Sequence, residues 1–162
     1  MMQDPNEIKE KIISVLKYKG PSLPVHIAGE IKTSILFSSA FLGELLSEKR
    51  VKISHMKVGS SPLYFLSGQE SLLENFSQHL KSKEKDAFLL LKEKKFLADS
   101  AQNPAIRVAL REIRDFALPF KKDGEVIWRY FLAPESEFKT MEEKEKPKPI
   151  EIEIKKPVVM EE

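Results

Sequence analysis

Residues 20–66 read GPSLPVHIAGEIKTSILFSSAFLGELLSEKRVKISHMKVGSSPLYFL, and this stretch decides the fold of the first half of the chain. Its apolar periodicity predicts a short helix over 24–31 and a longer helix over 34–49, which Thr33 or Ser34 can cap. The apolar positions of the longer helix include Leu36, Phe37, Ala40, Phe41, Leu45 and Leu46.

A β-hairpin is expected after these helices. Residues 51–54 alternate between apolar and polar side chains as a strand does, residues 59–62 read Gly-Ser-Ser-Pro, and residues 63–66 read as the returning strand. Working outward in the other direction, residues 7–18 have helical spacing, and Gly20 with Pro21 ends that helix. The predicted order is helix, helix, helix, strand, turn, strand.

The second half contains a similar but shorter series. Between its first two helices, residues 99–103 have room for a tight turn only, so a middle helix is either reduced or formed by the end of the preceding helix. The predicted elements are a helical connector over 70–82, helices over 84–98 and 104–114, an extended segment over 116–120, an Asp123-Gly124 turn and a strand over 126–132.

The two halves show a partial internal sequence repeat. Residues 64–66 and 130–132 are both Tyr-Phe-Leu, and each tripeptide ends a hairpin strand that follows a glycine-containing turn. These tripeptides are 66 residues apart, and with a shift of 65 Leu45 aligns with Leu110. We therefore interpret the chain as two copies of one supersecondary unit.

Three helices followed by a two-stranded wing resemble the winged helix-turn-helix family over about residues 7–67, where Glu48-Lys49-Arg50 precedes the first wing strand. The second unit looks like a divergent member over 84–132, and together they resemble paired winged-helix proteins of archaea. The resemblance implies a mainly α fold with small β-hairpins (α+β) and DNA binding, although winged helices also serve as protein-interaction modules. The expected domains are module 1 over 1–67, a connector over 68–83, module 2 over 84–133 and a charged, disordered tail over 134–162.

Charge is unevenly distributed along the chain. Residues 7–67 hold nine Lys or Arg against five Asp or Glu, residues 83–133 hold eleven against eight, and residues 138–162 hold six against seven. The two candidate modules are therefore mildly basic. The slightly acidic tail offsets part of their positive charge, so that the net charge of the whole chain is only +2.

The first module is poorly suited to sequence-specific recognition of DNA bases. Its predicted recognition helix has no Arg, Asn or Gln before Arg50, so the strong bidentate base contacts are missing. The serines of this region either contact DNA or are merely caps and packing residues, and the wing lysines either contact phosphate or are simply solvated. The candidate DNA contacts of this module are Lys32, Ser34, Ser38, Ser39, Lys52 and Lys57.

The second module offers the better cationic surface. Arg107, Arg111 and Arg114 recur every four and then three residues, which places them on one face of the predicted helix. Lys121, Lys122 and Arg129 are expected on its hairpin. Nearby acids can neutralise this surface. Trp128, the single tryptophan, is interpreted as a packing residue rather than a stacking platform.

The sequence offers no catalytic constellation. There is no cysteine, and the three histidines lie on different predicted elements without ligand spacing, so we predict no metal, no cofactor, no small-molecule substrate and no enzymatic activity. No apolar run approaches the length of a membrane span, and no secretory signal is evident. A soluble, cytoplasmic protein is expected.

The tail carries one alternating stretch, formed by Ile150, Ile152 and Ile154 with glutamates between them. The tail is either a solubilising segment or a partner motif that adds as a strand to another protein's sheet. Two functions follow from the whole sequence. The first is a DNA-binding protein of transcription or chromatin with weak sequence specificity. The alternative is a protein-protein interaction adaptor that uses the winged helices as scaffold.

Overall fold

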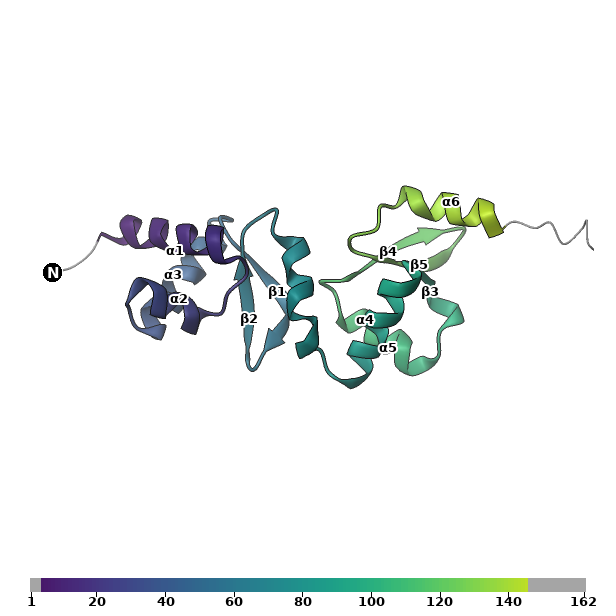
Figure 1. The fold of residues 1–162 in the computed structure, drawn as a ribbon, viewed down its shortest axis with the longest axis horizontal. Helices are drawn as coiled ribbons and strands as arrows, with labels where there is room; N and C mark the ends of the chain where they lie inside the picture. Colours follow the sequence, from purple (N-terminus) through teal and green to yellow (C-terminus); the bar gives the residue numbers. More distant parts are fainter. Residues whose placement is uncertain (1–3, 146–162) are drawn as a thin grey trace, which may run out of the picture. The chain divides into compact units, whose positions relative to one another are not determined.

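The computed structural model describes residues 4–145, with side chains described for residues 4–140. The chain divides into two units, residues 1–132 and residues 133–162. Helices alternate with two small antiparallel sheets in the first unit, which confirms the expected α+β class (Figure 1). None of the helices in the described residues is long and apolar enough to cross a membrane.

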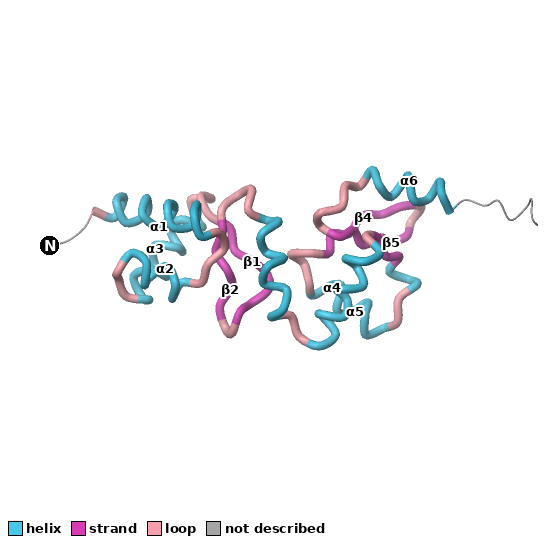
Figure 2. The backbone as a smooth tube through the Cα atoms, viewed as in Figure 1, coloured by secondary structure: helices cyan, strands magenta, loops and turns pink. Residues whose placement is uncertain are grey.

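In the first half of the first unit, three helices precede a hairpin, in the predicted order (Figure 2). Prolines open α1 and α2, and the Gly20 backbone, with φ of 84°, ends α1. The three helices pack together around a core that includes Ile12, Ile27 and Leu45. The elements are α1 (Pro5–Lys19), α2 (Pro24–Ile31), α3 (Ile35–Ser47), β1 (Lys52–Val58) and β2 (Ser61–Phe65).

The longer helix buries only part of the apolar residues that the sequence offers. α3 buries Leu42 and Leu45 and leaves Leu36, Phe37 and Ala40 exposed. Apolar spacing alone does not distinguish the two sides of a helix when both are apolar, and α3 is such a helix.

The second half begins with a short 3₁₀ connector and continues with the repeated unit. α4 packs against α5 and against β3 and β5 of a three-stranded sheet with order β3-β5-β4. The elements are η1 (Glu70–His79), α4 (Ser82–Lys94), β3 (Phe96–Ala98), η2 (Asp99–Ala101), α5 (Pro104–Glu112), β4 (Ala117–Lys122) and β5 (Glu125–Tyr130).

The prediction of one helix over 84–98 is wrong at its end. α4 stops at Lys94, and Lys95 adopts a positive φ of 72° that takes the chain out of the helix. Phe96–Ala98 then forms β3, which pairs with β5 and buries Phe96 and Leu97. The middle helix is reduced to the single 3₁₀ turn of η2, one of the two predicted alternatives.

Both halves also share a pairing that the sequence did not reveal. In the first half Ser22, between α1 and α2, exchanges two backbone hydrogen bonds with Tyr64 of β2, at 2.9 and 2.8 Å. In the second half the chain after α4 pairs as β3 with β5. In each half, the segment that follows the first helix lies against the last strand of the hairpin.

A carboxylate from the second half closes a bulge in the first. The register of β1 with β2 shifts between Ile53 and Lys57, which removes the amides in between from the ladder. Asp115 accepts hydrogen bonds from the amides of His55, at 2.9 and 3.1 Å, and of Met56, at 2.8 Å. The module boundaries expected at 67/68 and 83/84 therefore lie inside one unit, whose halves are joined by hydrogen bonds.

The second unit contains helix α6 (Ser136–Glu145). The expectation of a disordered tail from residue 134 is therefore wrong for these ten residues. The sequence interpretation gave more weight to the prolines farther along the chain, at positions 147, 149 and 157, than to the helix-forming residues of this segment. The proposed partner motif of Ile150, Ile152 and Ile154 lies outside the described residues.

Candidate functional site

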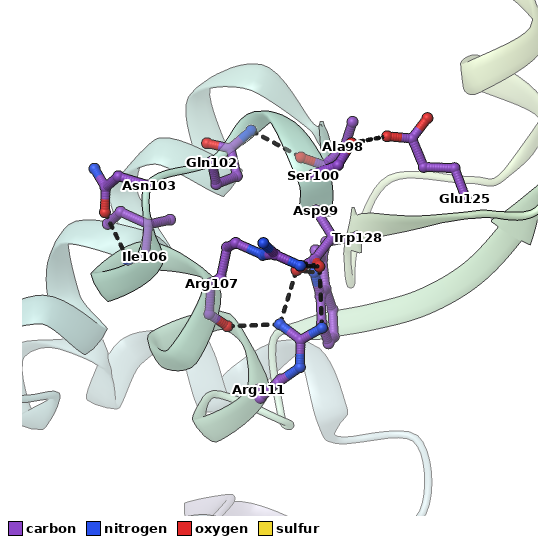
Figure 3. A network of polar contacts seen from close by, with 10 residues as sticks. All are labelled: Ala98, Asp99, Ser100, Gln102, Asn103, Ile106, Arg107, Arg111, Glu125 and Trp128. Atoms are coloured by element: carbon purple, nitrogen blue, oxygen red, sulfur yellow. Dashed lines mark hydrogen bonds and ion pairs between the residues drawn. The ribbon is translucent and has the colours of Figure 1, made fainter.

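A buried carboxylate organises the cationic side of the second half. Asp99 follows β3 directly, as the first residue of η2, and is 4% exposed. Its Oδ1 accepts hydrogen bonds from the indole of Trp128 at 3.0 Å and from Nη1 of Arg111 at 2.8 Å. Its Oδ2 accepts from Nε and Nη2 of Arg107, at 3.1 and 2.8 Å, and from Nη2 of Arg111 at 3.0 Å (Figure 3).

The two arginines are held in place by α5. Asn103 caps this helix by accepting a hydrogen bond from the Ile106 amide at 2.9 Å. The helix packs against α4 and buries Ile106 and Leu110. Arg107 and Arg111 stand one turn apart on its other side, with side chains 45% and 47% exposed. Their positions on one face confirm that part of the prediction.

Electrostatics keep Asp99 ionised. Hydrogen bonds from Arg111, with smaller contributions from Trp128 and Arg107, hold the pKa of the Asp99 carboxyl well below its usual range, although burial opposes the shift. The same pairing raises the pKa of Arg111. Two guanidinium groups and one carboxylate leave this cluster, which we call the Asp99 cluster, with one net positive charge.

The guanidinium groups retain donors for a ligand. Nη1 of Arg107 takes no part in the bonds to Asp99. The guanidinium of Arg111 lies 5.5 Å from the centre of the Trp128 ring, which fixes its plane. Trp128 itself is buried, as its interpretation as a packing residue predicts. The cluster therefore presents rigid, half-exposed donors to solvent.

Arg114 does not join this cluster. The helix predicted over 104–114 ends at Glu112, and Arg114 lies in the turn that follows, where its Nε donates to the Arg111 carbonyl at 3.4 Å. The expectation of three arginines on one helix face is therefore wrong for Arg114. Ile113 has a backbone ψ of 57°, outside the helical range, which ends the helix before the third arginine.

The predicted hairpin cations lie on the adjacent strands. Lys121 is exposed on β4, whereas Lys122 on β4 and Arg129 on β5 are half-buried. Arg129 donates to the Phe131 carbonyl at 3.4 Å. Of the cations predicted for this module outside the Asp99 cluster, Arg114 and Lys121 are therefore the exposed ones.

Most of the candidates in the first half do not form a cationic surface. Ser34 caps α3 by accepting the Phe37 amide at 3.1 Å. Ser38 is fully buried and donates to the Pro24 carbonyl at 3.3 Å, so its prediction as a DNA contact is wrong. Ser39 is half-buried. Ser34 therefore caps and Ser38 packs, as in the simpler interpretation.

The lysines of the first half are scattered. Lys32 is exposed at the end of α2, with a positive φ of 57°. Lys52 pairs with Glu70 at 2.7 Å, which neutralises it, and Lys57 is exposed on β1. The structure does not bring these three lysines together with any cluster comparable to that around Asp99.

The outer face of α3 is the feature that the sequence analysis missed. Ile35, Leu36 and Phe37 are 53%, 78% and 60% exposed. No residue from Thr33 to Gly43 carries a charge, in a chain that is 32% charged. The uncharged run was visible in the sequence, but only burial shows that it faces solvent. Asp99 had no local signal, because its partners lie 8, 12 and 29 residues later.

Comparisons with known proteins leave the family open. No protein-family model and no curated protein matches the sequence. Among solved structures, the chain resembles a hypothetical protein from Pyrobaculum spherical virus, with 15% identity and a TM-score of 0.36 over 76% of this chain and 95% of that one. A similarity at this level does not establish a shared fold.

Proposed function

We propose that the chain is a tandem winged-helix protein that binds duplex DNA with weak sequence specificity, mainly through its second module. The order of helices, 3₁₀ turn and hairpin in that module supports the proposal, as does the matching order in the first half. In this arrangement α5 corresponds to the helix that enters the major groove.

The observation that carries the proposal is the Asp99 cluster. Arg107 and Arg111 lie one turn apart on the exposed side of α5 and are fixed by one buried carboxylate. Pre-positioned guanidinium groups lose less conformational entropy when they bind a phosphate than free ones do. The cluster is therefore suited to contacting the DNA backbone.

The limited charge sets the expected strength. The cluster contributes one net positive charge, to which Arg114 and Lys121 add. With about three phosphates neutralised, the logarithm of affinity falls with the logarithm of salt concentration at a slope of about −3. Backbone contacts of this kind carry little sequence information, which accounts for the weak specificity.

Fluorescence anisotropy with a labelled DNA duplex tests the proposal. Wild-type protein at micromolar concentration binds at 50 mM salt, and the variant with Arg107→Gln and Arg111→Gln binds about tenfold or more weakly. The matched control, Lys11→Gln with Lys17→Gln, removes two exposed lysines of α1 and changes affinity little. Absence of wild-type binding at 50 mM salt contradicts DNA binding, and equal weakening in both variants contradicts the site.

One observation favours a second candidate function, a protein-protein interaction adaptor. The outer face of α3 is apolar and uncharged, as protein interfaces are at their centre and DNA interfaces are not. A pull-down with full-length protein and with a chain ending at residue 145, which keeps α6, separates the contributions. Partners retained after truncation bind the folded part, and partners lost on truncation bind through the tail, where the alternating isoleucines lie.

A further inference from the structure

The outer face of α3 forms a continuous ridge. Leu36, Ala40, Gly43 and Ser47 recur at helical spacing, and all four are exposed. Ile35 and Phe37 flank the ridge at its beginning. α3 carries no charged side chain before Glu44, one turn after Ala40, whereas an exposed helix of a monomeric protein normally turns charged residues to solvent.

Gly43 has no explanation within this chain. It lies inside α3, where glycine is less favourable than alanine because it leaves the unfolded backbone freer. A Cβ at this position meets nothing within 4 Å. The glycine is therefore not needed for the packing of its own chain, but it does permit the backbone of another helix to approach closely.

The size of the apolar surface fits the centre of a protein interface. Ile35, Leu36 and Phe37, each more than half exposed, supply on the order of 400 Å² of apolar surface. A specific complex buries about 800 Å² on each partner. Ile35, Leu36 and Phe37 therefore provide about half of that area.

Charge complementarity points to the occupant. Lys32 precedes the first turn of α3, and the other end carries Glu44 and Glu48, which share the single cation Lys9 at 2.9 and 2.7 Å. Lys32 thus places one positive charge before the face, and Glu44 and Glu48 keep one net negative charge beside Lys9. Lys49 and Arg50 follow after the helix has ended, and Arg50 pairs with Glu10. A second copy packed antiparallel brings Lys32 of each copy towards Glu44 and Glu48 of the other, and the uncharged centre opposes no like charges.

We propose that the protein forms a two-fold symmetric dimer in which α3 packs antiparallel against α3 of a second copy. With the axis between Ser39 and Ala40, Leu36 of each copy lies opposite Gly43 of the other. A large side chain then fills the space that the missing Cβ leaves. Nucleic acid does not suit this face, because its centre is apolar and uncharged and the exposed Lys32 only adjoins its beginning.

This dimer is independent of the proposed DNA binding, and it is measured without DNA. Sedimentation velocity on the full chain of 18.6 kDa, from about 1 to 200 μM, determines the mass and the dissociation constant. The expected result is a mass of two chains at the upper concentrations, with a dissociation constant in the micromolar range.

Two variants test the geometry. Leu36→Lys places a cation at the most exposed position of the ridge and weakens dimerisation at least 100-fold. The control Leu89→Lys makes the same change at another half-exposed leucine, on α4, and leaves the dissociation constant within about twofold. Circular dichroism confirms that both variants keep the wild-type helix content.

Gly43→Ala distinguishes close packing of two helices from non-specific hydrophobic association. The added methyl group meets nothing in its own chain, so the monomer melts at a higher temperature, yet the dimer dissociates about tenfold more readily. If the wild-type protein is still a monomer at 200 μM, the proposal is wrong, and a different protein is the remaining candidate to cover the face. A dimer that Leu36→Lys does not weaken, or that Gly43→Ala strengthens, overturns it as well.

Discussion

α3 and α5 occupy equivalent places in the two halves, each as the helix before a hairpin, and they present opposite surfaces. α5 exposes Arg107 and Arg111, both fixed on a buried carboxylate, whereas α3 exposes Leu36 and Phe37 and no cation until the helix has ended. The shared plan positions the two helices, and the side chains on the outer face decide what each of them contacts. We therefore propose that one framework serves two kinds of binding.

The largest expected effect is on the side of α5. Asp99→Ala leaves the buried indole N–H of Trp128 without an acceptor and frees two arginines, which costs about 3 kcal/mol of unfolding free energy. Urea denaturation followed by tryptophan fluorescence measures it. Glu93→Ala, at an exposed acidic residue of α4, is the control and changes stability by less than about 0.5 kcal/mol. A loss below 1 kcal/mol in Asp99→Ala would show that the cluster is not a structural anchor.

Acid weakens the second half through the same carboxylate. Because the folded pKa of Asp99 lies below its unfolded value of about 3.9, its stabilisation is complete above that pH and is lost as pH falls below it. The unfolding free energy contributed by Asp99 therefore decreases by about 1–2 kcal/mol between pH 4.5 and 2.5. Urea titrations of wild type and Asp99→Asn at several pH values isolate this part. Identical pH profiles of the two proteins would contradict it.

Asp115 tests the connection between the halves. Asp115→Ala removes the acceptor of the His55 and Met56 amides and costs about 1–2 kcal/mol. Hydrogen exchange at those two amides accelerates, while the amides of α3 stay protected. Glu112→Ala is the matched control, because its carboxylate lies 3.9 Å from His55 and bonds neither amide. Unchanged exchange in Asp115→Ala means that the bulge does not depend on the second half.

The smallest expected effect is on the side of α3. Gly43→Ala raises the unfolding free energy of the monomer by about 0.5–1 kcal/mol, because alanine favours the helix and no atom obstructs its Cβ. Thermal melts below the dissociation concentration of the dimer measure this gain. A decrease in stability instead indicates that the position is already crowded within the chain.

The sequence predicted elements better than surfaces. Prolines, caps and glycines placed α1, α2 and α3 to within about three residues, because those signals act on the local backbone. The break at Lys95 was missed, because Phe96 and Leu97 suit a helix as well as a strand and only pairing with β5 decides between them. The Asp99 cluster depends on contacts across the fold, which no local pattern encodes.

The arginine pair also shows what spacing in the sequence can and cannot predict. Their spacing correctly placed Arg107 and Arg111 together, but it gave no indication that one buried carboxylate holds both. Spacing also placed Arg114 with them, and the early end of α5 separates it. Periodicity specifies a face only for as long as the helix lasts.

Crossing the two sets of variants in two assays tests the division of roles between α3 and α5 most directly. Leu36→Lys and the variant with Arg107→Gln and Arg111→Gln are each measured for self-association by sedimentation and for duplex binding by anisotropy below the dimer dissociation constant. The expected result is that Leu36→Lys abolishes the dimer and spares DNA affinity, whereas the double arginine variant does the reverse. If either variant impaired both activities equally, or neither, the two helices would not have separate roles.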